Sequence, residues 1–340
     1  MSQRIVKVLI FTQASIPDPL IVRLRAVSPR LLIEHHTAQT IEAIDRSVWR
    51  DCEVLYTSWL MPTIDLVPNL KWVQGHFAGV DHFLDNPLIR SVILTTASGV
   101  HAPHMAEYIL MMMLAFAHRL PNMLNYQQRV DWPKDRWSLF APKELNDSTL
   151  GIVGYGSIGR ETARLAKSFG MHVLASKRDV HIKHEQGWQL PKSGDSSAQH
   201  VDRLYPPDQL RSMLSECDFV AVTVPLTAET EKMIGAAELR SMKRGAILIN
   251  VARGGVIDEA ALIDALQNNL IGGAGLDVFE EEPLPLNSPL WKLPNVILSP
   301  HVSGFSSHYD ERAMDLFAEN LRRYLTGESL LNVVDMNKGY

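Results

Sequence analysis

Three side chains in the second half of the chain have the residue types needed to bind an organic acid and to transfer a proton. They are Arg253, Glu282 and His301, and each follows a short apolar run typical of a buried strand. A guanidinium can hold a carboxylate through paired hydrogen bonds, and a carboxylate beside an imidazole stabilises the protonated ring, which can then donate a proton. Taken singly, they also fit a surface ion pair, a solvated acidic turn and a packing histidine. Together they indicate a reactive site at the carboxyl ends of parallel strands, where open α/β sheets bind their ligands.

A glycine-rich segment, Leu150–Gly159 (LGIVGYGSIG), has the pattern of a dinucleotide-binding turn between a strand and a helix. In such a turn the first glycine, Gly154, allows the sharp bend, and the second, Gly156, lets a pyrophosphate approach the backbone. The third, Gly159, lets the helix pack closely on the strand. The alternative is a structural turn that binds nothing. We favour dinucleotide binding, with contacts at Gly154, Tyr155, Gly156, Ser157, Ile158 and Gly159.

The residues after the next strand indicate which dinucleotide is bound. An NAD site has Asp or Glu there to bind the ribose hydroxyls, whereas the 2′-phosphate of NADP is bound by cations. The chain has Ser176, Lys177 and Arg178 at this point, followed by Asp179. Arg can bind a phosphate through two hydrogen bonds, and Lys attracts it as a point charge. We expect Ser176, Lys177 and Arg178 to bind NADP(H), with NAD(H) bound through Asp179 as the alternative.

Length and composition exclude several classes of protein. The chain has 340 residues, enough for two domains, and its 46% hydrophobic and 21% charged residues are typical of soluble globular proteins. A net charge of −5 argues against a nucleic-acid or anionic-membrane partner. The most apolar run, Ile109–Ala117, is far shorter than the roughly 20 residues that cross a bilayer. Without a signal-peptide pattern or metal-ligand spacing around Cys52 and Cys217, we expect a cytoplasmic protein with no metal.

Short apolar runs alternate with helical patterns along the chain, which predicts parallel-sheet α/β domains. In the first hundred residues we expect strands at Ile5–Phe11, Leu31–Glu34, Val54–Ser58, Trp72–Gln74 and Val92–Thr95, and helices at Pro19–Val27 and Ile41–Trp49. Later strands are expected at Leu150–Val153, Val173–Ala175, Phe219–Val224, Ala246–Asn250, Gly275–Val278 and Val296–Leu298. Helices are expected at Pro103–Arg119, Gly159–Phe169, Glu259–Gln267 and Ala313–Leu325, and a surface loop at Gln186–Gln199.

Two tryptophans, Trp132 and Trp137, follow the long apolar helix in a polar stretch. The interpretation that we favour is ordinary packing beneath a loop. The alternative is an arm that docks on a second subunit, because Trp is enriched at protein interfaces. The long helix and this stretch together suggest a homodimer.

The glycine fingerprint, together with the segments NVARGG, GLDVFEEEP and PHVSG, resembles the D-isomer-specific 2-hydroxyacid dehydrogenase family, in particular NADP-preferring glyoxylate and hydroxypyruvate reductases. The likeness covers nearly the whole chain. It implies two Rossmann-like or flavodoxin-like parallel-sheet domains, with the cofactor domain inserted into the substrate domain. The cofactor domain would be 102–302, and the substrate domain would combine 1–101 with 303–340. The active site would lie in the cleft between them.

The same resemblance gives roles to individual residues. His301 would be the general acid/base, Glu282 its partner, and Arg253 the anchor for the substrate carboxylate. Main-chain N–H groups of Ala78 and Gly79 would bind that carboxylate too, unless their loop is a plain turn. The residues expected around the nicotinamide are Pro225, Thr230, Val251, Ala252, Asp277 and Ser303.

The function implied is reduction of a small 2-oxo acid to the D-2-hydroxy acid, and the reverse, with hydride from the nicotinamide and a proton from His301. A second hypothesis, from another class, is a nucleotide-sensing interaction protein, because some relatives with this fold act as corepressors. The chain has no segment that resembles an added peptide-binding extension, so we favour the enzyme.

Overall fold

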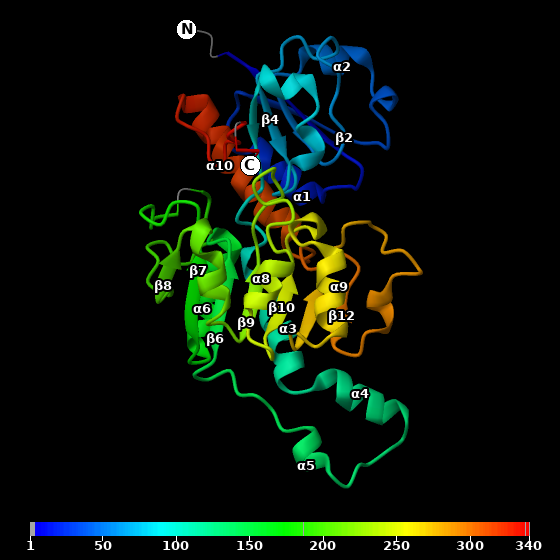
Figure 1. The fold of residues 1–340 in the computed structure, drawn as a ribbon. Coiled ribbons are helices and arrows are strands. Elements are labelled where there is room, and N and C mark those ends of the chain that lie inside the picture. Colours follow the sequence, from blue (N-terminus) through cyan, green and yellow to red (C-terminus); the bar gives the residue numbers. More distant parts are fainter. Residues whose placement is uncertain (1–3, 186, 337, 340) are drawn as a thin grey trace. The chain divides into compact units, whose positions relative to one another are not determined.

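A computed structural model of the chain describes residues 4–185, 187–336 and 338–339. They form two compact units, each drawn in Figure 1. Unit 1 contains the chain up to Val100, Gly187 and Trp188, and the residues from Ser306 onward; unit 2 contains His101–Glu185 and Gln189–Phe305. Each unit has its own parallel sheet covered by helices, so the predicted α/β class with two parallel-sheet domains is confirmed.

Unit 1 is built on a five-stranded sheet in the order β2-β1-β3-β4-β5, the order of flavodoxin-like folds. All neighbouring strands are parallel. Their side chains alternate between two apolar layers, with Val8 and Ile10 in one and Leu9 and Phe11 in the other. The strands are β1 (Val6–Thr12), β2 (Leu31–Thr37), β3 (Val54–Thr57), β4 (Trp72–Gly75) and β5 (Ile93–Thr95).

Helices cover both faces of this sheet. The helices α1 (Asp18–Arg25) and α10 (Tyr309–Thr326) pack on one face. The other face is covered by α2 (Arg46–Asp51) and the short turns η1 (Ile41–Ala43), η2 (Asp81–Phe83) and η3 (Pro87–Arg90).

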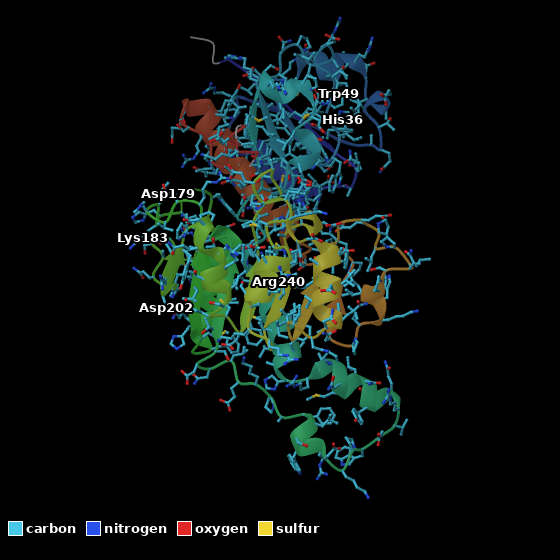
Figure 2. All side chains as sticks on the ribbon, in the orientation of Figure 1. His36, Trp49, Asp179, Lys183, Asp202 and Arg240 are labelled. Atoms are coloured by element: carbon cyan, nitrogen blue, oxygen red, sulfur yellow. The ribbon has the colours of Figure 1, made fainter. Side chains whose placement is uncertain are left out.

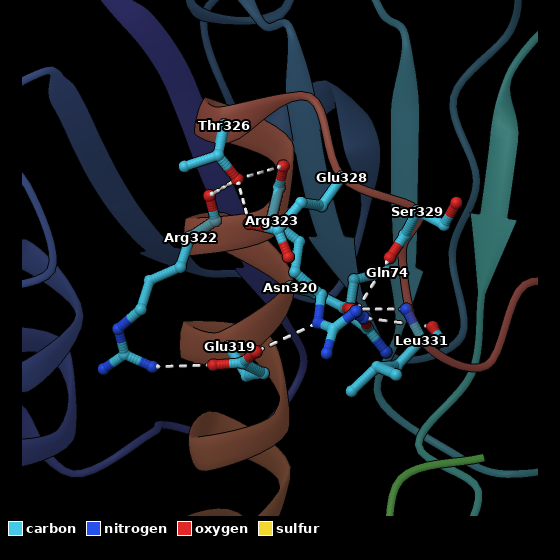
Figure 3. Close-up of polar contacts among 9 residues, drawn as sticks. All are labelled: Gln74, Glu319, Asn320, Arg322, Arg323, Thr326, Glu328, Ser329 and Leu331. Atoms are coloured by element: carbon cyan, nitrogen blue, oxygen red, sulfur yellow. Dashed lines mark hydrogen bonds and ion pairs between the residues drawn. The ribbon is translucent and has the colours of Figure 1, made fainter. Parts of the chain in front are cut away.

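The fully buried Asn320 ties α10 to the rest of unit 1 (Figure 3). Its amide donates to the Gln74 side chain on β4 and to the Leu331 carbonyl, both at 3.2 Å. Its side-chain oxygen accepts a 2.8 Å bond from the Leu331 N–H. The C-terminal helix is therefore an integral part of unit 1, although unit 2 separates it in the sequence from the five strands of this sheet.

Unit 2 is built on a seven-stranded parallel sheet in the order β12-β11-β10-β9-β6-β7-β8. The chain order reverses beside β6, because β7 lies on one side of it and β9 on the other. Such a switch point leaves a crevice outside the carboxyl ends of the strands. The strands are β6 (Thr149–Val153), β7 (His172–Ser176), β8 (Arg203–Tyr205), β9 (Phe219–Val222), β10 (Ile247–Asn250), β11 (Gly273–Leu276) and β12 (Val296–Leu298).

Alternate side chains of these strands enter two separate cores. Ile152 and Ile249 face the core shared with α3 (Ala102–Ala117) and α6 (Ser157–Ser168). Val153 and Leu248 face the core shared with α7 (Leu210–Leu214), α8 (Ala236–Ser241) and α9 (Glu259–Gln267). The remaining turns are η4 (Pro207–Gln209), η5 (Gly254–Val256) and η6 (Pro289–Lys292). No helix within the described ranges is long and apolar enough to cross a membrane.

The structure differs from the sequence prediction at three places. The stretch Ile41–Trp49 is not one helix, because the Asp45 side chain accepts the Ser47 N–H and starts α2 afresh after η1. The short strand β8 was not predicted. The favoured packing of the two tryptophans is wrong: Trp132 and Trp137 are 81% and 80% exposed. They belong to an arm with helices α4 (Leu120–Gln128) and α5 (Arg136–Leu139) that extends from the body of unit 2 (Figure 1).

Candidate active site

Three neighbouring strands of unit 2 carry the residues singled out for proton and acid chemistry. Arg253 follows β10, Glu282 lies in the loop after β11, and His301 follows β12, and these strands are adjacent in the sheet. The first two loops touch directly, since a Cβ on Gly254 would lie only 1.8 Å from the carbonyl carbon of Phe279. Glycine at 254 is therefore required for the loops that carry Arg253 and Glu282 to approach each other.

His301 and Glu282 form the central pair. Nδ1 of His301 lies 2.7 Å from Oε2 of Glu282, and Oε1 of Glu282 accepts a 3.0 Å hydrogen bond from the Phe279 N–H. The carboxylate is thus oriented by its own loop. Because Nδ1 faces the carboxylate, Nε2 is the ring nitrogen available to a reacting molecule. The two side chains are 46% and 36% exposed, so a small ligand can reach them.

Asp277, fully buried after β11, fixes the turn that carries His301. Its Oδ1 accepts from the Ser299 hydroxyl at 2.6 Å and the Val302 N–H at 2.9 Å, and Oδ2 accepts from the Ser303 N–H at 2.8 Å. The His301 N–H donates to the Asp277 carbonyl at 2.9 Å. His301 has φ +54°, a left-handed conformation that costs about 1–3 kcal/mol. The expected contact of Asp277 with nicotinamide stays a prediction; the contacts seen are with the histidine turn.

Arg253 is half-buried and sits on a loop that Asn250 shapes. The Asn250 side chain, 1% exposed, donates to the Arg253 carbonyl at 3.0 Å and accepts from the Ala252 N–H at 3.1 Å. One guanidinium nitrogen of Arg253 donates to the Ala252 carbonyl at 2.8 Å. Asn250, the last residue of β10, therefore fixes the conformation of the loop. The Arg253 guanidinium is thereby held at the carboxyl edge of the sheet.

The glycine fingerprint has the geometry that its three glycines predict. Gly154 has φ +106°, and a Cβ on Gly159 would lie 2.3 Å from the Gly154 carbonyl oxygen. At Gly156, by contrast, a Cβ would meet no described atom within 4 Å, and no side chain in the described residues caps the start of α6. Open backbone at an uncapped helix N-terminus beside the switch point fits the pyrophosphate of a dinucleotide.

The end of β7 places a hydroxyl and two cations beside this turn. Ser176 is buried, and the ammonium of Lys177 donates to the Ile182 carbonyl. Arg178 forms an exposed ion pair with Glu229, which follows β9. Burial, and after it the neighbouring Arg160 guanidinium, lowers the pKa of Lys177. The cations lie in a turn held by main-chain and carboxylate partners.

The residues expected around the nicotinamide follow β9, β10, β11 and β12, at the same edge of the sheet. The Thr230 hydroxyl donates to the Pro225 carbonyl at 2.6 Å, which closes the loop after β9. Val251, Ala252 and Ser303 are buried just after the strands. We therefore expect them to contact the nicotinamide through their backbone atoms. No group of three or more His, Cys, Asp or Glu suited to a metal occurs among the described residues.

The loop expected to bind the substrate carboxylate, Gly75–Asp81, belongs to unit 1 and follows β4. It is fixed at His76, whose Nδ1 lies 2.6 Å from the Tyr56 hydroxyl and whose carbonyl accepts from the Tyr309 hydroxyl. Burial lowers the pKa of His76 to about 4. Within the described part of the chain, the N–H groups of Ala78 and Gly79 donate to no acceptor.

Sequence reasoning missed a buried charged group beside the fingerprint. Arg160, in the first turns of α6, is 1% exposed, and its guanidinium carbon lies 4.7 Å from the centre of the Tyr155 ring. The Tyr155 side chain is itself buried, and its hydroxyl donates to Asp195 at 2.5 Å. Tyr155 therefore contributes its backbone, and not its side chain, to the open part of the fingerprint turn. The available signal was the pair of charged residues, Arg160 and Glu161, directly after the last glycine of the fingerprint.

Comparisons with known proteins agree with this arrangement. Residues 110–303 match the family model described as D-isomer specific 2-hydroxyacid dehydrogenase, NAD binding domain. The chain is 36% identical over 295 residues to a glyoxylate reductase of Korarchaeum cryptofilum, covering 84% of this chain and 83% of that protein. It is 37% identical over 271 residues to glyoxylate/hydroxypyruvate reductase B of Serratia proteamaculans, covering 79% and 78%.

A solved structure gives the same result for the fold. The crystal structure of a D-isomer specific 2-hydroxyacid dehydrogenase from Xanthobacter autotrophicus Py2, in complex with NADPH and MES, has a TM-score of 0.81 and 30% sequence identity to this chain. The match covers 98% of this chain and 99% of that one. The chain therefore belongs to the D-isomer specific 2-hydroxyacid dehydrogenase family.

Proposed function

We propose that the protein reduces a small 2-oxo acid to the D-2-hydroxy acid, and catalyses the reverse reaction, with NADPH as its preferred hydride donor. The observation that carries the proposal is the 2.7 Å contact between Nδ1 of His301 and Oε2 of Glu282. This contact stabilises an imidazolium whose other nitrogen can donate a proton to a carbonyl oxygen. When bound, the nicotinamide supplies the hydride.

The other residues hold the acid and stabilise charge. The Arg253 guanidinium binds the substrate carboxylate through its planar donors and stabilises the negative charge that develops on the carbonyl oxygen. In unit 1, the N–H groups of Ala78 and Gly79, which donate to no acceptor among the described residues, are proposed to bind a substrate carboxylate. Protonation by His301 then completes the alcohol, and Glu282 balances the charge of the ring while it carries the proton.

The strand tip supports NADP over NAD. The only acidic side chain of the turn Ser176–Asp179 is that of Asp179, and its Oδ1 accepts from the His181 N–H at 2.9 Å, within its own turn. Lys177 and Arg178 provide the cations that a 2′-phosphate requires. The NADPH bound in the similar Xanthobacter structure is consistent with this preference. NAD(H) is the alternative cofactor.

Similarity to glyoxylate and glyoxylate/hydroxypyruvate reductases favours glyoxylate and hydroxypyruvate as the substrates. The test is NADPH oxidation with a panel of 2-oxo acids, including glyoxylate, hydroxypyruvate and pyruvate, repeated with NADH. We expect turnover with at least one short acid and a higher kcat/KM with NADPH. A protein that binds NADPH but turns over none of these acids would contradict the proposal.

We also propose that the α4–α5 arm docks on a second copy of the chain to form a homodimer. Val130, Trp132 and Trp137 of this arm are 94%, 81% and 80% exposed, and α4 has no buried residue. Exposed apolar side chains of this size are typical of an interface. Sedimentation should give a dimer for the parent protein and a monomer after Trp132→Ser combined with Trp137→Ser. A monomeric parent would exclude this role of the arm.

A further inference from the structure

The segment between β7 and β8 is held down by one buried guanidinium. Arg160 donates from one nitrogen to the Lys183 carbonyl at 2.8 Å and from another to the Asp195 carbonyl. Its Nε lies 3.8 Å from the Glu185 carboxylate. A fully buried guanidinium is stable only when its donors are paired, and here the partners come from two distant points of the same segment.

Further bonds attach the second of these points to the fingerprint turn and α6. The Tyr155 hydroxyl donates to Asp195, whose carboxylate also accepts the Gln199 and His200 N–H groups at 2.7 Å. The Glu161 carboxylate, 3% exposed, accepts the Gly194 N–H at 2.5 Å. The predicted surface loop is thus irregular but anchored at its centre; its first residue, Gln186, lies outside the described residues.

The anchored segment begins with the cations at the end of β7. Lys177 donates to the Ile182 carbonyl, and the next residue, Lys183, is the one whose carbonyl Arg160 holds. The turn that carries Arg178 is therefore fixed by two hydrogen bonds, one from Lys177 to the Ile182 carbonyl and one from Arg160 to the Lys183 carbonyl. Figure 2 shows Asp179 and Lys183 near the end of the sheet at which β7 ends.

We propose that Arg160 is a positioning residue that fixes the turn Lys177–Lys183 as the binding site for the 2′-phosphate of NADPH. The proposal rests on the NADPH preference proposed above. Arg160 does not contact the phosphate. Its guanidinium donates to backbone carbonyls that fix the conformation of the turn, so the cations of the turn are ordered before the phosphate binds. An ammonium cannot replace the guanidinium, because it lacks the rigid fork that reaches two carbonyls at once.

The test measures binding of adenosine 2′,5′-bisphosphate and of adenosine 5′-monophosphate, which differ only in the 2′-phosphate, by isothermal titration calorimetry. The variants are Arg160→Lys and Tyr155→Phe, with Lys167→Gln as the control. Lys167 lies on the same helix but pairs with Asp202, beside the start of β7. We expect Arg160→Lys to weaken the bisphosphate about tenfold and Tyr155→Phe about threefold, with the monophosphate changed less than about twofold. Lys167→Gln should change neither.

Limited trypsin digestion gives a second measurement that does not depend on activity. Cleavage after Lys177, Arg178 and Lys183 should be slow in the parent protein and several-fold faster in Arg160→Lys, without faster cleavage in unit 1. If Arg160→Lys does not fold, Tyr155→Phe, which removes only one hydroxyl, carries the test.

Folded variants that bind the bisphosphate as tightly as the parent would overturn the role of Arg160 and leave the NADPH preference intact. A parent that binds the two nucleotides equally would overturn the preference itself, and with it the site. The two failures are therefore distinguishable.

Discussion

His301 and Glu282 follow neighbouring strands, and Nδ1 of the imidazole lies 2.7 Å from Oε2 of the carboxylate. The Phe279 N–H donates to the other carboxylate oxygen and orients it. In Glu282→Gln the hydrogen bond to Nδ1 can persist, but the negative charge that stabilises the imidazolium is lost. We expect kcat for 2-oxo acid reduction to fall about 100-fold while the Kd of NADPH stays within about twofold. The control is Glu281→Gln, which removes the adjacent carboxylate. Equal effects of the two variants would contradict the pairing.

Asp277 should matter through the shape of the histidine turn. In the parent protein, both carboxylate oxygens of Asp277 accept N–H groups of the turn 302–303. In Asp277→Asn, one of these oxygens is replaced by an amide nitrogen that can only donate. A buried donor facing a donor costs about 1–3 kcal/mol, so the free energy of unfolding should fall by that amount. We also expect kcat to fall at least tenfold because His301 is displaced. Ser299→Ala, which removes one of the three donors, should have a clearly smaller effect on both quantities.

Much of the fold and site could be predicted because the signals are local. The strands that precede Arg253, Glu282 and His301 are short, mostly apolar runs; β10 and β11 are largely buried, as expected inside a parallel sheet, and β12 at its edge is half-buried. Gly154 has a positive φ, and Gly159 approaches the Gly154 carbonyl oxygen, so both requirements arise within the turn itself. Patterns of this kind can be recognised without knowing the tertiary structure.

The rest depends on contacts between residues far apart in sequence. Nothing local distinguishes Asp195 from the other polar residues around it, yet it is 4% exposed because Tyr155 reaches it from the fingerprint turn and Arg160 from α6. Strand β8 has three residues and follows that polar segment, so it shows no clear alternation. The two tryptophans have the residue type of a core, and only the path of the α4–α5 arm places them in solvent.

The fingerprint glycines should separate cofactor binding from stability. In Gly156→Ala the added Cβ meets no described atom within 4 Å, so the free energy of unfolding should change by less than about 1 kcal/mol. It would occupy the space expected for the pyrophosphate, so NADPH binding should weaken at least about tenfold. In Gly159→Ala the Cβ lies 2.3 Å from the Gly154 carbonyl oxygen, and we expect a loss of about 1–3 kcal/mol. Calorimetric binding and urea unfolding check both; unchanged NADPH affinity in Gly156→Ala would contradict the assignment.

His76 should make the stability of the protein depend on pH. Burial lowers its pKa from 6.5 to about 4, so the unfolded chain takes up a proton first as the pH falls. The stabilisation is present above about pH 6.5 and is lost as the pH falls toward 4, by about 2 kcal/mol between pH 7 and pH 5. Asp310, 3.8 Å from Nε2, acts in the opposite direction at lower pH because burial raises its pKa.

Comparison with a variant isolates the histidine from the other groups that titrate in this range. In His76→Gln the free energy of unfolding should be lower than in the parent at pH 7, because the buried Tyr56 hydroxyl loses its present partner. It should then decline less steeply between pH 7 and pH 5, so that the two curves converge. His36→Gln, a half-exposed histidine of β2, should leave the slope of the parent unchanged. Urea unfolding at several pH values measures the slopes, and parallel curves for the parent and His76→Gln would show that His76 is not the group responsible.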